Sequence, residues 1–171
     1  MPDGRLGDVV VSPGDIAPEL DVDGWVGTPT PLASVRGHVV LIEAFQMLCA
    51  GCIYHGLPQA QRVQRLFPDV VVVGLHTAFE HRAVTGRDAL EVFVSELGIS
   101  FPVAIDRHDS DTIPITMRRY ALGGTPSTIV IDRSGRVRLS HLGTLDDLAL
   151  GGVLGRLLAE ATSHPGPAIQ S

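Results

Sequence analysis

Two unbroken apolar runs stand out in the pattern of hydrophobic and polar positions along the chain. Residues 39–45 and 70–75 are rich in valine, leucine and isoleucine, and neither shows the regular polar alternation of a half-exposed strand. Strands buried on both faces of a sheet read in this way. The pattern therefore predicts a strand at each run, and a central parallel strand at 70–75.

Helical periodicity follows each of these runs. Apolar residues recur at helical spacing over residues 50–66 and 87–97, with a kink or break expected near Pro58 and a stop at Gly98. The side chains expected to form the buried stripes are Leu57, Ala60, Val63, Leu66 and Phe67 in the first helix, and Ala89, Leu90, Phe93, Val94 and Leu97 in the second.

The remaining segments complete an alternating order of strands and helices. Short apolar stretches broken by turn residues at 14–30 predict a small hairpin or an irregular entry segment. Further along, the pattern predicts a strand at 102–106, a short helix at 115–120, strands at 127–131 and 137–141 joined by a turn at 132–135, and a final helix at 145–161. This order predicts an α/β fold with a central mixed β-sheet flanked by helices on both faces.

Length and composition fit one domain with a well-buried core. The chain has 171 residues, of which 44% are hydrophobic and 19% are charged. We expect this domain to cover residues 12–162, between a flexible amino terminus at 1–11 and a flexible carboxyl-terminal tail at 163–171.

Charge and hydropathy exclude two classes of partner. The net charge is −6, and no basic cluster is interleaved with aromatic residues, which argues against nucleic acid as a partner. No stretch reaches the roughly 18 apolar residues that a membrane span requires. The first residues also lack the basic and apolar segments of a signal peptide, so we expect a cytoplasmic protein with no membrane partner.

The only two cysteines, Cys49 and Cys52, lie three positions apart just after the apolar run 39–45. At the start of a helix, free N–H groups favour the thiolate of the first cysteine. The spacing brings the two sulfurs within bonding reach, and it places the second to attack a mixed disulfide formed at the first. The pattern predicts a redox pair in which Cys49 is the nucleophile and Cys52 the resolving thiol.

Other interpretations of the cysteine pair are weaker. A structural disulfide closing so small a loop removes little chain entropy. A zinc site normally needs four nitrogen or sulfur ligands, and only His55 follows at a suitable spacing. A c-type haem site requires histidine directly after the second cysteine, where this chain has Ile53. Metal binding and incidental buried thiols remain the alternatives.

Four short matches carry a resemblance to the redoxin branch of the thioredoxin-fold family. They are the entry segment 14–18, the start of a strand at 37–42, the pair Cys49–Cys52, and the Gly-Thr-Pro turn at 124–127. This branch includes the TlpA- and ResA-like thiol–disulfide oxidoreductases and the AhpC/TSA-related peroxiredoxins. The resemblance covers residues 12–160 and implies a thioredoxin-like fold. It also implies that the redox-active disulfide needs no metal or organic cofactor. The partners would be disulfide-containing proteins or small thiols and an upstream thiol reductant.

The resemblance also implies further site residues. Thr125 and Pro126 would be joined by a cis peptide bond that faces the disulfide and offers the backbone of residue 125 as an edge to an extended substrate. We place Ala50 and Gly51, between the two cysteines, beside them in the substrate-binding surface.

Glu43 interrupts the first apolar run, six residues before Cys49, at the position of the family's buried acid. Burial raises the pKa of a carboxyl, so that it can accept a proton from Cys52. The alternative is a glutamate at the end of a strand whose carboxylate reaches solvent.

Two departures from the family pattern bear on function. Gln46 stands where peroxiredoxins have the threonine of their T-x-x-C motif, and Met47 and Leu48 replace aromatic residues near the pair. We therefore favour a thiol–disulfide oxidoreductase over a peroxiredoxin-like peroxidase or a non-catalytic redox-sensing module.

The histidines receive no firm role. His55 could tune the thiols or lie on the surface. His76 and His81 follow a central strand at its carboxyl end, where α/β proteins place their active sites, but a loop role is favoured for both.

Overall fold

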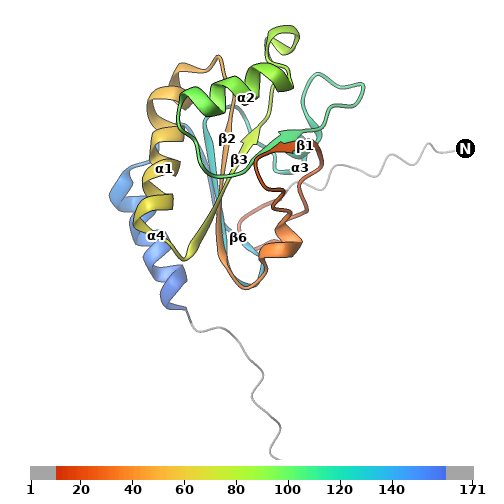
Figure 1. The fold of residues 1–171 in the computed structure, drawn as a ribbon. Helices are drawn as coiled ribbons and strands as arrows, with labels where there is room; N and C mark the ends of the chain where they lie inside the picture. Colours follow the sequence, from red (N-terminus) through yellow and green to blue (C-terminus); the bar gives the residue numbers. More distant parts are fainter. Residues whose placement is uncertain (1–10, 161–171) are drawn as a thin grey trace, which may run out of the picture.

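A six-stranded mixed sheet forms the centre of the molecule (Figure 1). The computed structural model describes residues 11–160, so apart from Val11 the ends expected to be flexible lie outside the described residues. The strands are β1 (Val22–Val26), β2 (Val39–Phe45), β3 (Val70–His76), β4 (Val103–Asp106), β5 (Ser127–Ile131) and β6 (Val137–Leu142). Their spatial order is β1-β4-β3-β2-β5-β6. The central strands β2, β3 and β4 are parallel, and β1, β5 and β6 run antiparallel to their neighbours.

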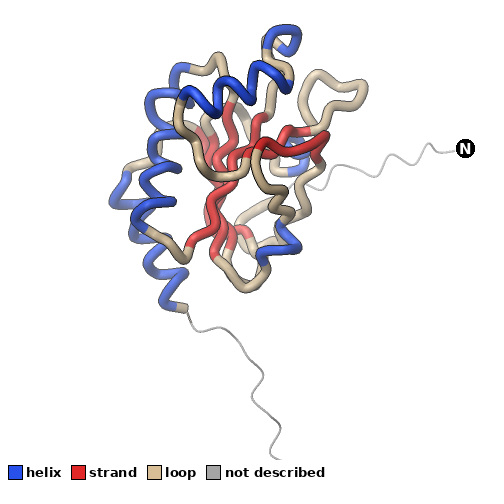
Figure 2. Tube along the Cα trace, viewed as in Figure 1, coloured by secondary structure: helices blue, strands red, loops and turns tan. Residues whose placement is uncertain are grey.

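Helices cover both faces of the sheet (Figure 2). They are α1 (Leu57–Leu66), α2 (Arg87–Glu96), α3 (Ile115–Arg119) and α4 (Asp147–Ala159), with a π turn η2 (Cys52–Gly56) and the 3-10 turns η1 (Leu32–Val35) and η3 (Arg82–Val84). Helices α1, α2 and α4 pack on one face, while α3, η1 and the entry segment pack on the other. The expected α/β architecture is confirmed.

The position of β2 in the sheet explains why the sequence of residues 39–45 is almost entirely apolar. Val39, Leu41 and Phe45 point into the core under α1 and α4, and the alternate residues Val40 and Ile42 point into the core on the opposite face. Because the strand lies between β3 and β5 and is covered on both faces, all seven of its side chains are buried. The strand ends at the sheet edge that carries the cysteine pair.

The first helix departs from its predicted form at Pro58. The break lies in the turn before it, where the N–H of Leu57 donates to the carbonyl of Cys52, five residues back. Such a π turn accommodates a proline, which lacks an N–H and whose ring would clash with the carbonyl four residues back in a regular helix. The helix therefore continues to Leu66 without ending.

Three expectations about burial were wrong, and one of the two alternatives for the entry segment is excluded. Leu66 is 71% exposed and Leu97 is also exposed, because both lie at the carboxyl ends of their helices, beyond the last turn that packs on the sheet. Ala89 lies beside the buried stripe and is exposed. The entry segment forms no hairpin of its own, since β1 pairs with the distant strand β4.

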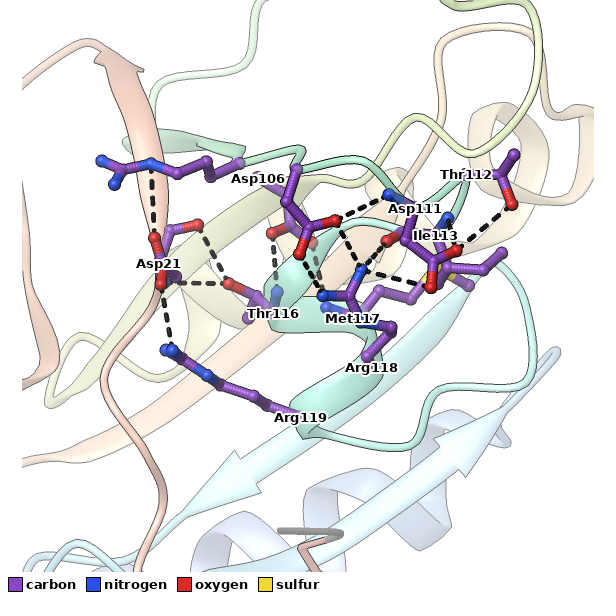
Figure 3. Close-up of polar contacts among 11 residues, drawn as sticks. Asp21, Asp106, Asp111, Thr112, Ile113, Thr116, Met117, Arg118 and Arg119 are labelled. Carbon is purple, nitrogen blue, oxygen red and sulfur yellow. Dashed lines mark hydrogen bonds and ion pairs between the residues drawn. The ribbon is translucent and has the colours of Figure 1, made fainter. Parts of the chain in front are cut away.

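Carboxylates fix the short helix α3 to the sheet (Figure 3). The carboxylate of Asp106, at the end of β4, accepts hydrogen bonds from the backbone N–H groups of Thr116 (2.8 Å) and Met117 (3.0 Å). The backbone N–H of Asp21 donates to the Thr116 hydroxyl at 2.9 Å, and the Asp21 carboxylate pairs with Arg119 at 3.0 Å. So short a helix is stabilised by these tertiary contacts. They hold the segment that leads into the Thr125–Pro126 turn.

Candidate active site

The cysteine pair lies at the carboxyl end of β2, where the chain turns into the first helix. Cys49 and Cys52 form a disulfide with their Cα atoms 5.3 Å apart. Cys49 is partly exposed, whereas Cys52 is completely buried. The backbone N–H of Cys52 donates to Cys49 Sγ at 3.2 Å, as expected for a sulfur at a helix start. One sulfur thus faces solvent while the other lies behind it.

The Thr125–Pro126 turn faces the disulfide. Its peptide bond is cis. Cys49 Sγ lies 3.6 Å from the carbonyl oxygen of Thr125 and 3.7 Å from its hydroxyl oxygen. A Cβ atom on Gly51 would lie 3.1 Å from the Pro126 ring, so the glycine allows this turn to approach the helix start closely. Ala50 lies exposed at the rim of the same site.

Glu43 is buried beneath the cysteine pair. It is 1% exposed, and its Oε2 accepts a hydrogen bond from the Thr128 hydroxyl at 2.9 Å. Its Oε1 is buried and finds no hydrogen-bond partner within residues 11–160. Burial raises the pKa of this carboxyl to about 8, against the opposing effect of the Thr128 hydrogen bond. The alternative of a solvated glutamate is therefore wrong.

Gly56 brings this carboxyl against the helix. A Cβ atom at this position would collide with Glu43 Oε1 and lie 2.9 Å from Pro126 Cβ. Cys52 and Gly56 are four residues apart in the helix and so share a face. Glu43 therefore lies under the turn that begins with the buried cysteine.

A cleft of about 300 Å³ opens beside this carboxyl. It is lined by η2 and by the loop between β6 and α4, and both Gly56 and Thr128 form part of its wall. Both residues also lie against Glu43, so the buried carboxyl sits behind the wall of the cleft.

Three residues of this site were missed from the sequence: Gly56, Thr128 and Gln46. A glycine inside a helical pattern was the available signal for Gly56. Gln46, a polar residue at the end of a buried strand, accepts a hydrogen bond from the N–H of Glu80 at 3.0 Å and donates to the Thr125 hydroxyl at 3.5 Å. Nothing in the sequence near Thr128 indicated its contact with Glu43.

The histidines lie in three different settings. His76 ends β3 and so belongs to a strand, contrary to the favoured loop role. It is 3% exposed, and its ring centroid lies 5.4 Å from that of Phe45. Burial lowers the pKa of His76 to about 4, which keeps the ring neutral. His55 is exposed on η2, and His81 is exposed at the start of η3 with a positive φ of 53°.

Residues 11–160 contain neither a metal-binding cluster nor a membrane-spanning helix. Across residues 11–160, no three histidine, cysteine, aspartate or glutamate side chains gather into a group that could hold a metal ion. In the same part of the chain, every helix is too short or too polar to cross a membrane.

Comparison with known proteins gives consistent matches. No protein-family model matches the chain. The chain is 33% identical over 140 residues to the protein DipZ of Mycobacterium tuberculosis. The aligned region covers 76% of this chain but only 19% of DipZ, so the chain spans about a fifth of that relative's length.

Two solved structures match over nearly their whole length. The thioredoxin-like superfamily protein SPOA0173 is 44% identical, with a TM-score of 0.83 over 86% of this chain and 98% of that one. A thiol-disulfide isomerase from Corynebacterium glutamicum is 48% identical, with a TM-score of 0.81 over 85% and 98%.

Proposed function

Since this chain belongs to the thioredoxin-like superfamily, we propose that it is a thiol–disulfide oxidoreductase that reduces or exchanges disulfides in partner proteins. One observation carries the proposal. The partly exposed Cys49, bonded to the buried Cys52, lies at a helix start and within 3.6 Å of the backbone carbonyl of Thr125. This arrangement combines a reachable sulfur, a protected second sulfur and a backbone edge for a substrate.

The reaction balances as two thiol exchanges. The Cys49 thiolate attacks one sulfur of the partner's disulfide, forms a mixed disulfide and releases the partner's other sulfur as a thiolate. Cys52 then attacks Cys49 Sγ, re-forms the Cys49–Cys52 bond and releases the second partner thiol. The partner gains two electrons and the pair loses two. Two molecules of a small thiol, or one protein dithiol, supply the two electrons that restore the reduced pair and are themselves oxidised to a disulfide.

Glu43 is the proposed proton acceptor for Cys52. The buried Cys52 thiol must lose its proton to attack, and burial makes the isolated thiolate costly. A carboxyl whose pKa is raised to about 8, under the same helix turn, can take that proton in its ionised form, whose share grows as the pH rises toward and above 8. The cleft beyond Thr128 gives the proton a short route to solvent.

The substrate-binding surface is proposed to surround Cys49. The backbone of Thr125 and the cis bond to Pro126 support an extended partner segment, and Ala50 and Gly51 border it. The nearby Leu48 and Tyr54 are exposed, which suits contact with a partially apolar protein chain.

The compartment sets the direction of electron flow in this proposal. In the cytoplasm thiols are kept reduced, and there the pair would act as a reductant. Fractionation of cells that make the natural protein tests this location. Recovery from an oxidising compartment would reverse the expected direction.

Reduction of insulin disulfides driven by dithiothreitol tests the function. We expect turnover by the wild type, none above background with Cys49→Ser, and covalent adducts trapped by Cys52→Ser. Absence of wild-type turnover and of adducts would contradict a general reductase. Rapid thiol loss at low peroxide concentration would instead favour a peroxidase.

A further inference from the structure

Gln46 links the Thr125–Pro126 turn, which faces Cys49, to the loop between β3 and α2. Its side chain is 6% exposed and lies directly after β2, beside the cysteine pair. The side-chain amide makes two hydrogen bonds, one as an acceptor and one as a donor. One is to the backbone N–H of Glu80 (3.0 Å), and the other is to the hydroxyl of Thr125 (3.5 Å).

The first contact fixes which way the amide faces. A backbone N–H only donates, so the oxygen of the Gln46 amide must face Glu80. The NH₂ group of the amide then faces Thr125, and it has only hydrogens to offer. The Thr125 hydroxyl is therefore the acceptor in this contact, and the direction of the hydrogen bond is set by the backbone of the loop.

The Thr125 hydroxyl also lies beside Cys49. Because the Thr125 hydroxyl oxygen accepts from Gln46, its own hydrogen is available for the next neighbour, and Cys49 Sγ lies 3.7 Å from that oxygen. When the pair is reduced, the Cys49 thiolate is an acceptor for this hydrogen and for the N–H of Cys52 at 3.2 Å. Hydrogen bonds to the charged form lower the pKa of a thiol.

We propose that Gln46 is a positioning residue that holds the Thr125 hydroxyl as a hydrogen-bond donor to the Cys49 thiolate. Gln46 acts through Thr125 and does not touch the sulfur. The proposal deepens the function given above and rests on it, since a more stable thiolate matters only where Cys49 is the attacking group. A purely structural role, in which Gln46 anchors the loop at Glu80, predicts no change at the sulfur.

The test is the pKa of Cys49 in the reduced full chain, measured from the pH dependence of thiolate absorbance and of Cys49 alkylation. Gln46→Met keeps the length of the side chain and removes both hydrogen bonds. We expect a roughly tenfold smaller thiolate fraction at a pH below the pKa, as for loss of one good donor to a thiolate. Thr125→Val removes the donor itself and should give a shift at least as large, whereas Thr125→Ser keeps a hydroxyl and should give the wild-type value.

The double variant tests whether Gln46 affects the pKa of Cys49 through the Thr125 hydroxyl or by a separate interaction. When Gln46→Met is added to Thr125→Val, no further shift is expected, because the hydroxyl through which Gln46 acts is already gone. An unchanged pKa in Gln46→Met, or an equal shift on both backgrounds, would overturn the proposal.

A second variant covers the risk that Gln46→Met disturbs the fold. Gln46→Glu keeps the acceptor for the Glu80 N–H, so the loop stays anchored, but its carboxylate draws the Thr125 hydrogen away from the sulfur. The pKa of Cys49 should rise, and this rise should shrink in the Thr125→Val background. Insulin turnover is recorded separately, so that failure of the proposed function leaves the pKa result readable.

Discussion

At the scale of single residues, Glu43 is the group whose setting departs most from that of a free side chain. It is buried, it has one hydrogen bond, and its pKa is raised to about 8. If it accepts the proton of Cys52, only its ionised form is active, so the resolving step should accelerate as the pH rises through this pKa.

Replacing this carboxyl tests that role. Glu43→Gln keeps an oxygen for the Thr128 hydroxyl but cannot take a proton, so attack by Cys52 should slow by about a hundredfold and lose its inflection near pH 8. The measurement is the release of thionitrobenzoate from its mixed disulfide with Cys49. Glu96→Gln, at an exposed position at the end of α2, serves as the matched control. An inflection that persists in Glu43→Gln would exclude Glu43 as the base.

Gly56 is a second residue whose identity the packing dictates. Gly56→Ala forces a Cβ atom into Glu43 Oε1 and Pro126, and we expect it to lower the free energy of unfolding by about 1–3 kcal/mol. Gly155→Ala is the control, since a Cβ atom there meets nothing within 4 Å in α4. It should stabilise the protein by about 0.5–1 kcal/mol. The free energies of unfolding of both variants are measured by denaturant titration. Equal changes in the two variants would mean that the helix relaxes to accommodate the added Cβ atom at Gly56.

At the scale of elements, helix α3 depends on contacts outside itself. Asp106→Asn leaves one oxygen facing two backbone N–H groups, at Thr116 and Met117, and turns an NH₂ group toward one of them. The expected loss of stability is about 1–3 kcal/mol. Hydrogen exchange should show α3 opening first, and unchanged protection there would show that packing alone holds it.

Elements differ in how far the sequence reveals them. Strands β2 and β3 could be predicted from the sequence, because burial on both faces of the sheet requires an unbroken apolar pattern. Strand β1 was not, since its partner β4 is remote and the register is set by tertiary pairing. The π turn η2 was also hidden, because its apolar periodicity is the same as that of an α-helix over so few residues.

The residues of the candidate site also divide into some that the sequence predicted and some that it could not. Cys49 and Cys52 are neighbours in the chain, so their spacing alone predicted the pair. Gln46 and Thr128 act through partners that are 79 and 85 residues away, so no local pattern could reveal them.

At the scale of the whole molecule, two buried groups with opposite pKa shifts shape the dependence of stability on pH. Glu43 is protonated in the folded state up to about pH 8 but only to about 4.5 when unfolded, so it destabilises the fold as the pH rises between these values. His76 is neutral in the folded state down to about pH 4 but is protonated below 6.5 when unfolded. It therefore destabilises the fold as the pH falls across that range.

The two slopes cancel where they overlap. We expect a nearly flat free energy of unfolding between pH 4.5 and 6.5 and a decline from 6.5 to 8, measured by denaturant titration at a series of pH values. In Glu43→Gln the profile should rise from pH 4.5 to 6.5 and then stay level. A wild-type decline that survives in Glu43→Gln would assign it to another group.

The Thr125–Pro126 turn has a consequence for how such a protein can change over time. The two sulfurs are three positions apart in the chain, yet the backbone carbonyl and hydroxyl that face Cys49 come from a turn 76 residues away. The two sulfurs and one part of the proposed partner surface are therefore encoded in separate stretches of the gene. Substitutions that keep the Thr125 hydroxyl can therefore reshape this part of the partner surface while both cysteines stay unchanged.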